Sequence, residues 1–203
     1  MIVIIDYEMG NVQSVKNAID FLGYEALISR RKEDIRNAKK LILPGVGSFK
    51  KGIINLKKFG LIDILTDEVI NKKKPVLGIC LGMQLLAKGG EEGGKSLGLG
   101  WIDANVRLLK HKEGLKIPHV GWDNIKKEKD DLTLKDIPNN SDFYFVHSYA
   151  VVPNDKKIIT STCTYGEKFA STINQNNIYA TQFHPEKSQE SGLKILENFI
   201  KNA

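Results

Sequence analysis

Short apolar runs alternate with amphipathic stretches along the first eighty residues. The apolar runs predict buried strands over residues 2–6, 25–29, 41–43 and 76–79. Between them, apolar residues recur at helical spacing, which predicts helices over 12–22, near 33–38 and, most clearly, over 61–70. Strand and helix in regular alternation favour an α/β fold with a mainly parallel central sheet and helices on both faces.

The pattern changes after residue 100, where strand-like segments follow one another with little helix between them. These segments are 101–109, 143–152, 158–165 and 178–183, and they predict an antiparallel extension of the sheet. A last helix is expected near 189–201, with an apolar face. Because no linker, repeat or low-complexity segment interrupts the chain, we expect a single three-layer domain over residues 1–203.

Composition narrows the class of protein. A chain of 203 residues with 41% hydrophobic residues suits one well-filled domain. The two cysteines, Cys80 and Cys163, lie far apart without Cys-x-x-Cys spacing, which favours a reducing compartment and no zinc site. With no signal-peptide pattern and no apolar run of about 20 residues, we expect a cytoplasmic protein without a membrane partner. The net charge of +6 comes from scattered lysines without interleaved aromatics, so we expect no nucleic-acid partner.

One cysteine has the surroundings of a nucleophile. Cys80 ends the apolar run 76–79, with Gly78 two residues before it and Gly82 two residues after it, and the apolar run 83–87 predicts a following helix. This is the pattern of a nucleophile elbow with cysteine in place of serine. The N-terminus of the helix would favour a thiolate. The alternative interpretation is a small buried residue in a core strand.

A base for this cysteine is available at the end of another strand. Four histidines occur, and His184 follows the strand-like segment 178–183, with Glu186 two residues further on. In an extended segment this spacing would point both side chains to the same side, so that the carboxylate could orient the imidazole. The alternative is a surface His-Pro turn with a solvated glutamate. Together with the elbow, the triad Cys80, His184 and Glu186 is the better interpretation.

The glycines after the third predicted strand could form an oxyanion hole. Residues 44–47 read Pro-Gly-Val-Gly, which lets backbone N–H groups approach a substrate closely. We expect donors from Val46 or Gly47 and from Leu81, the residue after the nucleophile. The alternatives are a phosphate-binding loop and a plain turn, and no Gly-x-Gly-x-x-Gly or Walker pattern supports the phosphate-binding loop. No histidine pair has metal-ligand spacing, so we expect neither a metal nor another cofactor.

Several motifs together resemble a known family. Residues 78–84 (GICLGMQ) and 182–188 (QFHPEKS) resemble the nucleophile and His-Pro-Glu motifs of the triad-type, class I glutamine amidotransferases. Residues 6–11 (DYEMGN), 44–49 (PGVGSF), 118–122 (PHVGW) and 143–149 (FYFVHSY) resemble, within that family, the glutaminase subunits of imidazole glycerol phosphate synthases. The motifs occur in order from residue 6 to residue 188, over nearly the whole chain.

The resemblance implies an activity and a set of site residues. Glutamine would be hydrolysed to glutamate and ammonia through a thioester on Cys80, with His184 as base and acid and Glu186 orienting it. The residues expected around the glutamine are Gly45, Gln84, His147, Ser148 and Tyr149.

The resemblance also implies a partner. Ammonia would pass to a (β/α)8 cyclase subunit, which makes imidazole glycerol phosphate in histidine biosynthesis, so we expect a heterodimer. A glutaminase domain uses almost all of the 203 residues and leaves none for a synthase domain. Asn11, Trp122, Tyr144 and Lys187 would lie at or near the subunit interface.

One position departs from the subfamily pattern. Asp123 follows Trp122 where asparagine is expected, and a carboxylate lacks the amide donor. This leaves the catalytic residues intact but keeps two alternatives open. One is a paralogous glutaminase that supplies ammonia for amidation or amidination of a sugar. The other is a stand-alone cysteine hydrolase acting on γ-glutamyl compounds.

Overall fold

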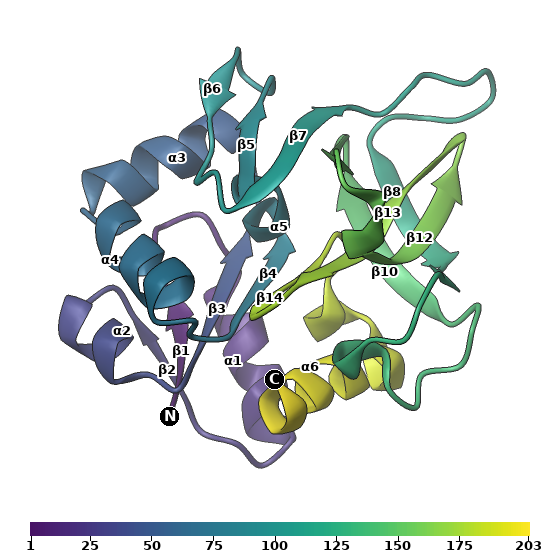
Figure 1. Cartoon of the computed structure of the whole chain (residues 1–203). Helices are drawn as coiled ribbons and strands as arrows, with labels where there is room; N and C mark the ends of the chain where they lie inside the picture. The colour runs from purple at the N-terminus through teal and green to yellow at the C-terminus, as the bar shows by residue number, and fades with distance from the viewer.

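An eight-stranded sheet forms the centre of the computed structural model, which describes all residues from 1 to 203 (Figure 1). Its strand order is β2-β1-β3-β4-β14-β13-β12-β9. The five strands from β2 to β14 pair in parallel, and the three beyond them pair antiparallel. The strands are β1 (Ile2–Ile5), β2 (Ala26–Ser29), β3 (Lys40–Gly45), β4 (Val76–Cys80), β9 (Lys126–Lys127), β12 (Ile159–Tyr165), β13 (Glu167–Gln175) and β14 (Ile178–Thr181).

Helices cover both faces of the sheet because the parallel strands are apolar on both sides. Within β1, Val3 and Ile5 belong to one core cluster, while Ile2 and Ile4 belong to another. The first cluster lies against α2 (Lys32–Asn37), α3 (Phe49–Lys58), α4 (Ile62–Thr66) and α5 (Leu81–Leu85), and the second against α1 (Val12–Phe21) and α6 (Gln189–Asn202). The predicted α/β, three-layer fold with an antiparallel extension is therefore confirmed.

Two smaller sheets build the rim on one side of the central sheet. A four-stranded sheet has the order β11-β7-β5-β6, and β8 pairs with β10 antiparallel in a two-stranded sheet. The strands are β5 (Ala87–Gly90), β6 (Ser96–Leu97), β7 (Ile102–Leu108), β8 (His119–Asn124), β10 (Asp142–His147) and β11 (Tyr149–Pro153). The single strand predicted over 143–152 is wrong, because the chain changes sheets at Ser148. Only His147 and Ser148 interrupt the apolar and aromatic residues of this segment, so the pattern did not separate two strands from one.

Some predicted helix bounds also differ from the structure. The helix after Cys80 starts at Leu81 and ends at Leu85, and residues 87–90 form a strand, so the prediction of a helix through Ala87 is wrong. The helix expected over 61–70 is α4 followed by a π-helical turn, Asp67–Asn71. Short apolar stretches do not distinguish helix from strand by their period, which accounts for the first difference.

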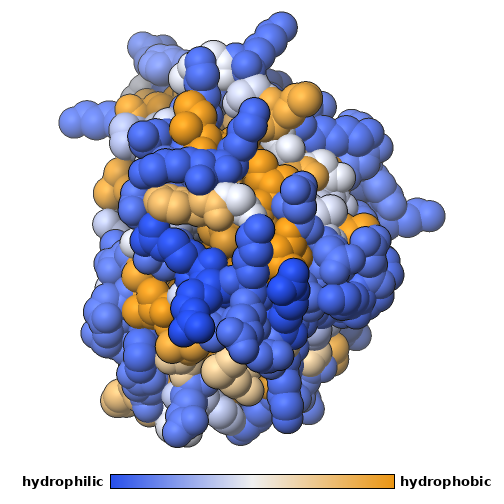
Figure 2. Space-filling view, turned by 90° about the vertical axis from the view of Figure 1, so that its left-hand side faces the viewer, coloured by the Kyte–Doolittle hydropathy of each residue, from blue (hydrophilic) through white to orange (hydrophobic).

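The outer surface of the helical layer is largely polar. Figure 2 shows the side that carries α2, α3 and α4, where hydrophilic side chains dominate and apolar groups appear in smaller patches between them. No helix has the length and apolar character required to cross a bilayer.

Candidate active site

Cys80 ends β4 and forms a sharp elbow with α5. Its backbone has φ 53°, in the left-handed region that is costly for a residue with a side chain. The flanking glycines permit the turn: a Cβ on Gly82 would lie 1.7 Å from the carbonyl oxygen of Leu43, and one on Gly78 would lie 3.0 Å from the backbone of Gly82. The elbow geometry predicted for these residues is therefore present at the carboxyl edge of the sheet.

His184 and Glu186 form a buried pair after β14. Nδ1 of His184 lies 2.8 Å from Oε1 of Glu186, and both side chains are 2% exposed. His184 itself is extended, as expected, but the prediction of an extended segment through Glu186 is wrong, because Pro185–Lys187 forms a 3-10 turn with proline at its first position. The turn nevertheless brings the carboxylate to the imidazole, as the sequence indicates.

The electrostatics of His184 favour its protonated form. Burial lowers the pKa of His184, but the neighbouring Cys80 and Glu186 outweigh this and raise it to about 10. No hydrogen bond of ordinary geometry reaches Nε2 of His184. We therefore attribute the shift to the nearness of two acidic groups and not to a formed bond with the sulfur. A protonated imidazole beside a cysteine is the arrangement that activates thiol nucleophiles.

A cavity of about 420 Å³ opens at Cys80. Gly45, His184 and Glu186 do not line it; Gly45 lies in β3, paired with Cys80 and packed against the Tyr7 hydroxyl. The other predicted oxyanion and substrate residues share this cavity, namely Val46, Gly47, Leu81, Gln84, His147, Ser148 and Tyr149.

Two of the predicted oxyanion N–H groups, those of Leu81 and Val46, differ in whether they already have a hydrogen-bond acceptor. The N–H of Leu81 stands at the first position of α5, where no acceptor exists within the helix. The N–H of Val46 instead donates to the carbonyl of Met9 at 2.5 Å. In this conformation the Val46 donor is occupied, so it can reach a substrate only if this hydrogen bond breaks. The third predicted residue, Gly47, lines the same cavity.

Hydrogen bonds next to the cavity connect helix α5 with the 147–149 segment and with Gln182. The Gln84 amide nitrogen donates to the carbonyl of Tyr149 at 2.8 Å and lies 3.3 Å from Oε1 of Gln182. The Gln182 amide nitrogen lies 3.7 Å from Sγ of Cys80. Since Nδ1 of His147 also lies 2.9 Å from the Tyr149 carbonyl, that oxygen fixes both α5 and the 147–149 segment.

Three of the residues expected at a partner interface gather on one face. Tyr144 and Trp122 are cross-strand neighbours in β10 and β8 with ring centroids 6.0 Å apart, and Nζ of Lys187 lies 5.9 Å from the Tyr144 ring centroid. Trp122 is 46% exposed. Asn11 caps α1, which packs against the 185–187 turn beside them.

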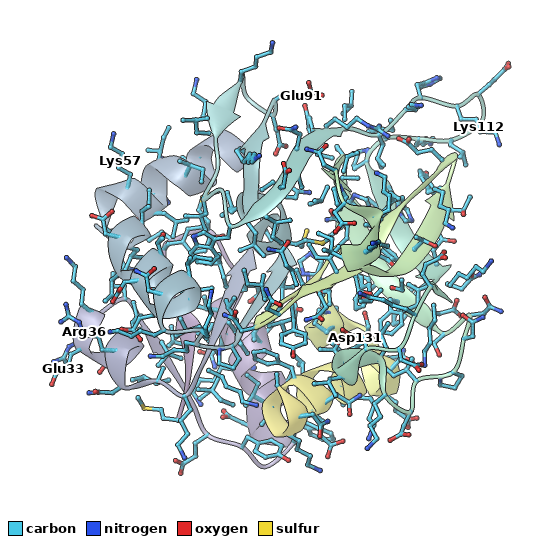
Figure 3. All side chains as sticks on the ribbon, viewed as in Figure 1. Glu33, Arg36, Lys57, Glu91, Lys112 and Asp131 are labelled. Atoms are coloured by element: carbon cyan, nitrogen blue, oxygen red, sulfur yellow. The ribbon has the colours of Figure 1, made fainter.

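One acidic residue of the cavity was not predicted. Glu92 follows β5 and is the only acidic residue in the lining; its carboxylate accepts the N–H of Phe49 at 2.8 Å. Burial raises the pKa of Glu92, opposed by that hydrogen bond. Figure 3 labels its neighbour Glu91 at the end of β5. The glycine-rich run 89–94 has no recognisable motif, so the sequence offered no signal beyond two glutamates between glycines.

The elbow, the buried His-Glu pair and the α/β frame define a class of cysteine-dependent amidotransferase. A family model described as "Glutamine amidotransferase class-I" matches residues 3–203, and the chain belongs to this family. The predicted resemblance is thereby confirmed.

Relatives within the family narrow the comparison. The chain is 51% identical over 203 residues, all of both chains, to "Imidazole glycerol phosphate synthase subunit HisH 2" of Methanococcus maripaludis. It is 45% identical over 201 residues to the protein of the same name in Pseudomonas aeruginosa, covering 99% of both chains. It is 47% identical over 201 residues to "Imidazole glycerol phosphate synthase subunit HisH 1" of Campylobacter jejuni, covering 99% of this chain and 100% of that one.

Solved structures agree on the fold at much lower identity. A structure titled "Crystal structure of glutamine amidotransferase" has a TM-score of 0.71 at 22% identity and covers 97% of this chain and 98% of its own. "Structure of PurLQS from Thermotoga maritima" gives 0.73 at 16% identity, covering 98% and 96%.

Proposed function

We propose that this chain is the glutaminase subunit of an imidazole glycerol phosphate synthase. It hydrolyses the side-chain amide of glutamine and delivers ammonia to a (β/α)8 cyclase subunit in histidine biosynthesis. The observation that carries the chemistry is the strained Cys80 on the cavity beside the buried His184–Glu186 pair. The full-length relatives named as synthase subunits support the pathway.

The proposed reaction follows from the order of the groups. The thiolate of Cys80 attacks the amide carbon, and the carbon–nitrogen bond breaks as His184 gives a proton to the leaving ammonia. A water molecule then loses a proton to His184 and attacks the thioester, which releases glutamate and restores the thiolate. Glu186 holds the imidazole through Nδ1 in both steps.

Substrate binding uses one acidic group and neutral polar groups of the cavity. Glu92 can pair with the α-ammonium of glutamine, and Ser148 and Tyr149 line the same cavity. Charge-assisted hydrogen bonds of this kind are about twice as strong as neutral ones.

The occupied Val46 donor suits a subunit whose activity depends on a partner. A free glutaminase would waste glutamine, because ammonia released to water is protonated and lost. With Val46 bonded to Met9, only part of the oxyanion hole is ready. Each such donor contributes about 3 kcal/mol to the transition state, so completing the hole would raise kcat by about 10²–10³.

A second candidate is the paralogous glutaminase that serves a sugar-modifying pathway. Methanococcus maripaludis has relatives named both HisH 1 and HisH 2, which are 46% and 51% identical to this chain. The numbering means that one organism carries two such proteins, which need not share a partner. Asp123 follows Trp122 in β8, but its side chain lies on the opposite face of the strand, where it contacts His119.

The test is glutamate release from glutamine by wild type and Cys80→Ala, with and without the cyclase subunit of the same genome and its nucleotide substrate. Strong Cys80-dependent stimulation by the pair supports the histidine pathway. Cys80-dependent activity without stimulation favours the sugar-modifying partner, and turnover preferring longer γ-glutamyl chains favours the stand-alone hydrolase. Absence of glutamate release under every condition contradicts the proposal.

A further inference from the structure

A chain of polar contacts, here called the relay, runs from Asp123, on the face of β8 opposite to Trp122, to the cavity beside Cys80. Oδ2 of Asp123 lies 2.7 Å from Nε2 of His119, and Nδ1 of His119 lies 3.2 Å from Nε2 of His147. Nδ1 of His147 then lies 2.9 Å from the carbonyl of Tyr149. His119 is 1% exposed and the Asp123 side chain 37%, so the relay runs from a half-exposed carboxylate into the protein. None of these contacts takes part in the reaction described above.

The two ends of the relay fix where its protons must be. A carbonyl only accepts, so Nδ1 of His147 carries a proton. Burial keeps His147 neutral by lowering its pKa to about 3, so its Nε2 accepts a hydrogen bond from Nδ1 of His119. The carboxylate of Asp123 also only accepts, which requires a second donor on His119, at Nε2. Every contact is satisfied only when the Asp123–His119 pair holds one extra proton.

Two aromatic rings flank the imidazole of His119. Its ring is stacked between Phe145 and Tyr165, with centroids 4.9 Å and 4.0 Å away. Aromatic faces attract a positive charge. Phe169 of β13 meets the ring edge.

Few other titratable groups face this site. The Tyr165 hydroxyl is turned away and donates to the carbonyl of Lys116. Burial, and after it Asp123, raises the pKa of Cys163 in β12 to about 12, so it stays a neutral thiol. On the side of His147 away from His119, the positive charge of His184 also lowers the pKa of His147. Burial outweighs the opposing effect of Asp123 and lowers the pKa of His119 below its ordinary value. The requirement for a proton therefore rests on the geometry of the contacts, with Nε2 of His119 2.7 Å from the carboxylate of Asp123.

Resting on the proposed glutaminase activity, we propose that Asp123 and His119 are positioning residues: by sharing a proton they fix His147, and through it the Ser148–Tyr149 backbone of the glutamine cavity. Loss of the proton leaves one contact of His119 without a donor. The Tyr149 carbonyl also accepts from Gln84, so release of His147 loosens the segment at its junction with α5.

The test compares Asp123→Ala and Asp123→Asn in the full chain, alone and saturated with the cyclase subunit. In Asp123→Ala the relay loses its anchor, and we expect KM for glutamine to rise about tenfold, equivalent to about 1.4 kcal/mol, with kcat changed by less than about twofold. In Asp123→Asn the amide donates to a neutral His119, so KM stays near that of wild type. Asp142→Asn, on the neighbouring strand β10, is the matched control and should change neither constant.

Two further readouts separate positioning from simple stability. KM of wild type should rise with pH as His119 loses its proton, whereas KM of Asp123→Asn should not. Nitrogen NMR should find both ring nitrogens of His119 protonated in wild type, and only Nδ1 protonated in Asp123→Asn. A neutral His119 in wild type, or an unchanged KM in Asp123→Ala, would overturn the proposal. If no variant releases glutamate, the proposed function fails, while the NMR signals still decide the charge of His119.

Discussion

Local surroundings distinguish the two cysteines of this chain. Cys80 ends a strand at a cavity, beside His184. Cys163 lies in a closed apolar cluster, where burial and the nearby Asp123 raise its pKa to about 12. Thiol reactivity follows the thiolate fraction and exposure, so we expect chemistry at the first cysteine only.

Glu186→Gln tests how the imidazole is held. Removing the carboxylate withdraws one of the two groups that raise the pKa of His184 to about 10, so that pKa falls. We expect kcat to drop by about 10²–10⁴, and the alkaline limb of its pH profile to move to lower pH. Steady-state glutamate release across the pH range measures both. Glu113→Gln, in an exposed loop, is the control, and a profile of Glu186→Gln that matches it would contradict the role.

At the scale of elements, the contact between β3 and the elbow is the tightest constraint near the site. Gly82→Ala would place a methyl group 1.7 Å from the Leu43 carbonyl oxygen, so strand and helix must separate. We expect a loss of about 3 kcal/mol or more in the free energy of unfolding, measured with denaturant. Gly114→Ala, in an open loop with φ 82°, has no such neighbour and should cost only about 1–2 kcal/mol. Equal losses would refute the steric account.

A second contact between elements is an ion pair between β13 and β7, and its contribution to stability depends on pH. Glu167 of β13 accepts two hydrogen bonds from Arg107 of β7 and one from the Lys110 N–H, which lowers the pKa of Glu167 to about 2. Because the folded value lies below the unfolded one, this stabilisation is complete above about pH 4.5 and is lost as pH falls toward 2.

Glu167→Gln should therefore lower the free energy of unfolding at pH 7 by about 1–2 kcal/mol, allowing for solvent screening of the half-exposed arginine. The difference from wild type should shrink steadily between pH 4.5 and 2. Denaturant unfolding at several pH values measures it, and a difference independent of pH would argue against the ion pair.

The sequence predicts the parallel half of the fold better than the rim. Strands β1, β3 and β4 contribute apolar residues to the core clusters on both faces of the sheet, so their runs are visible without partners. Strands β5 and β6 contain glycine and polar residues that pair only in the folded chain, and they were not predicted. The three residues of the predicted triad could be named because they lie within two short motifs. Glu92 and the contact between His119 and His147 depend on segments distant in sequence, so the pattern alone could not reveal them.

At the scale of the whole molecule, the cavity and the predicted partner face are neighbours. Lys187 lines the cavity and also approaches Tyr144, which packs against Trp122. A partner seated on this face would therefore lie beside the site where ammonia is released. This arrangement suits transfer of ammonia without loss to solvent.

Trp122→Ala should weaken binding of the cyclase subunit by about 2 kcal/mol, or about 30-fold in Kd, because exposed aromatic anchors dominate such interfaces. The matched control is Leu97→Ala, whose side chain is 81% exposed on β6, away from this face. Titration calorimetry with the cyclase measures both. Equal affinities for Trp122→Ala and wild type would place the interface elsewhere.

The central claim is covalent catalysis by Cys80, and the most direct measurement is the mass of the intact protein after acid quenching during turnover of glutamine. We predict an adduct of one glutamyl group, located on Cys80 by peptide mapping and absent from Cys80→Ala, which releases no glutamate. Sustained glutamate release by Cys80→Ala, or an adduct on another residue, would contradict the account.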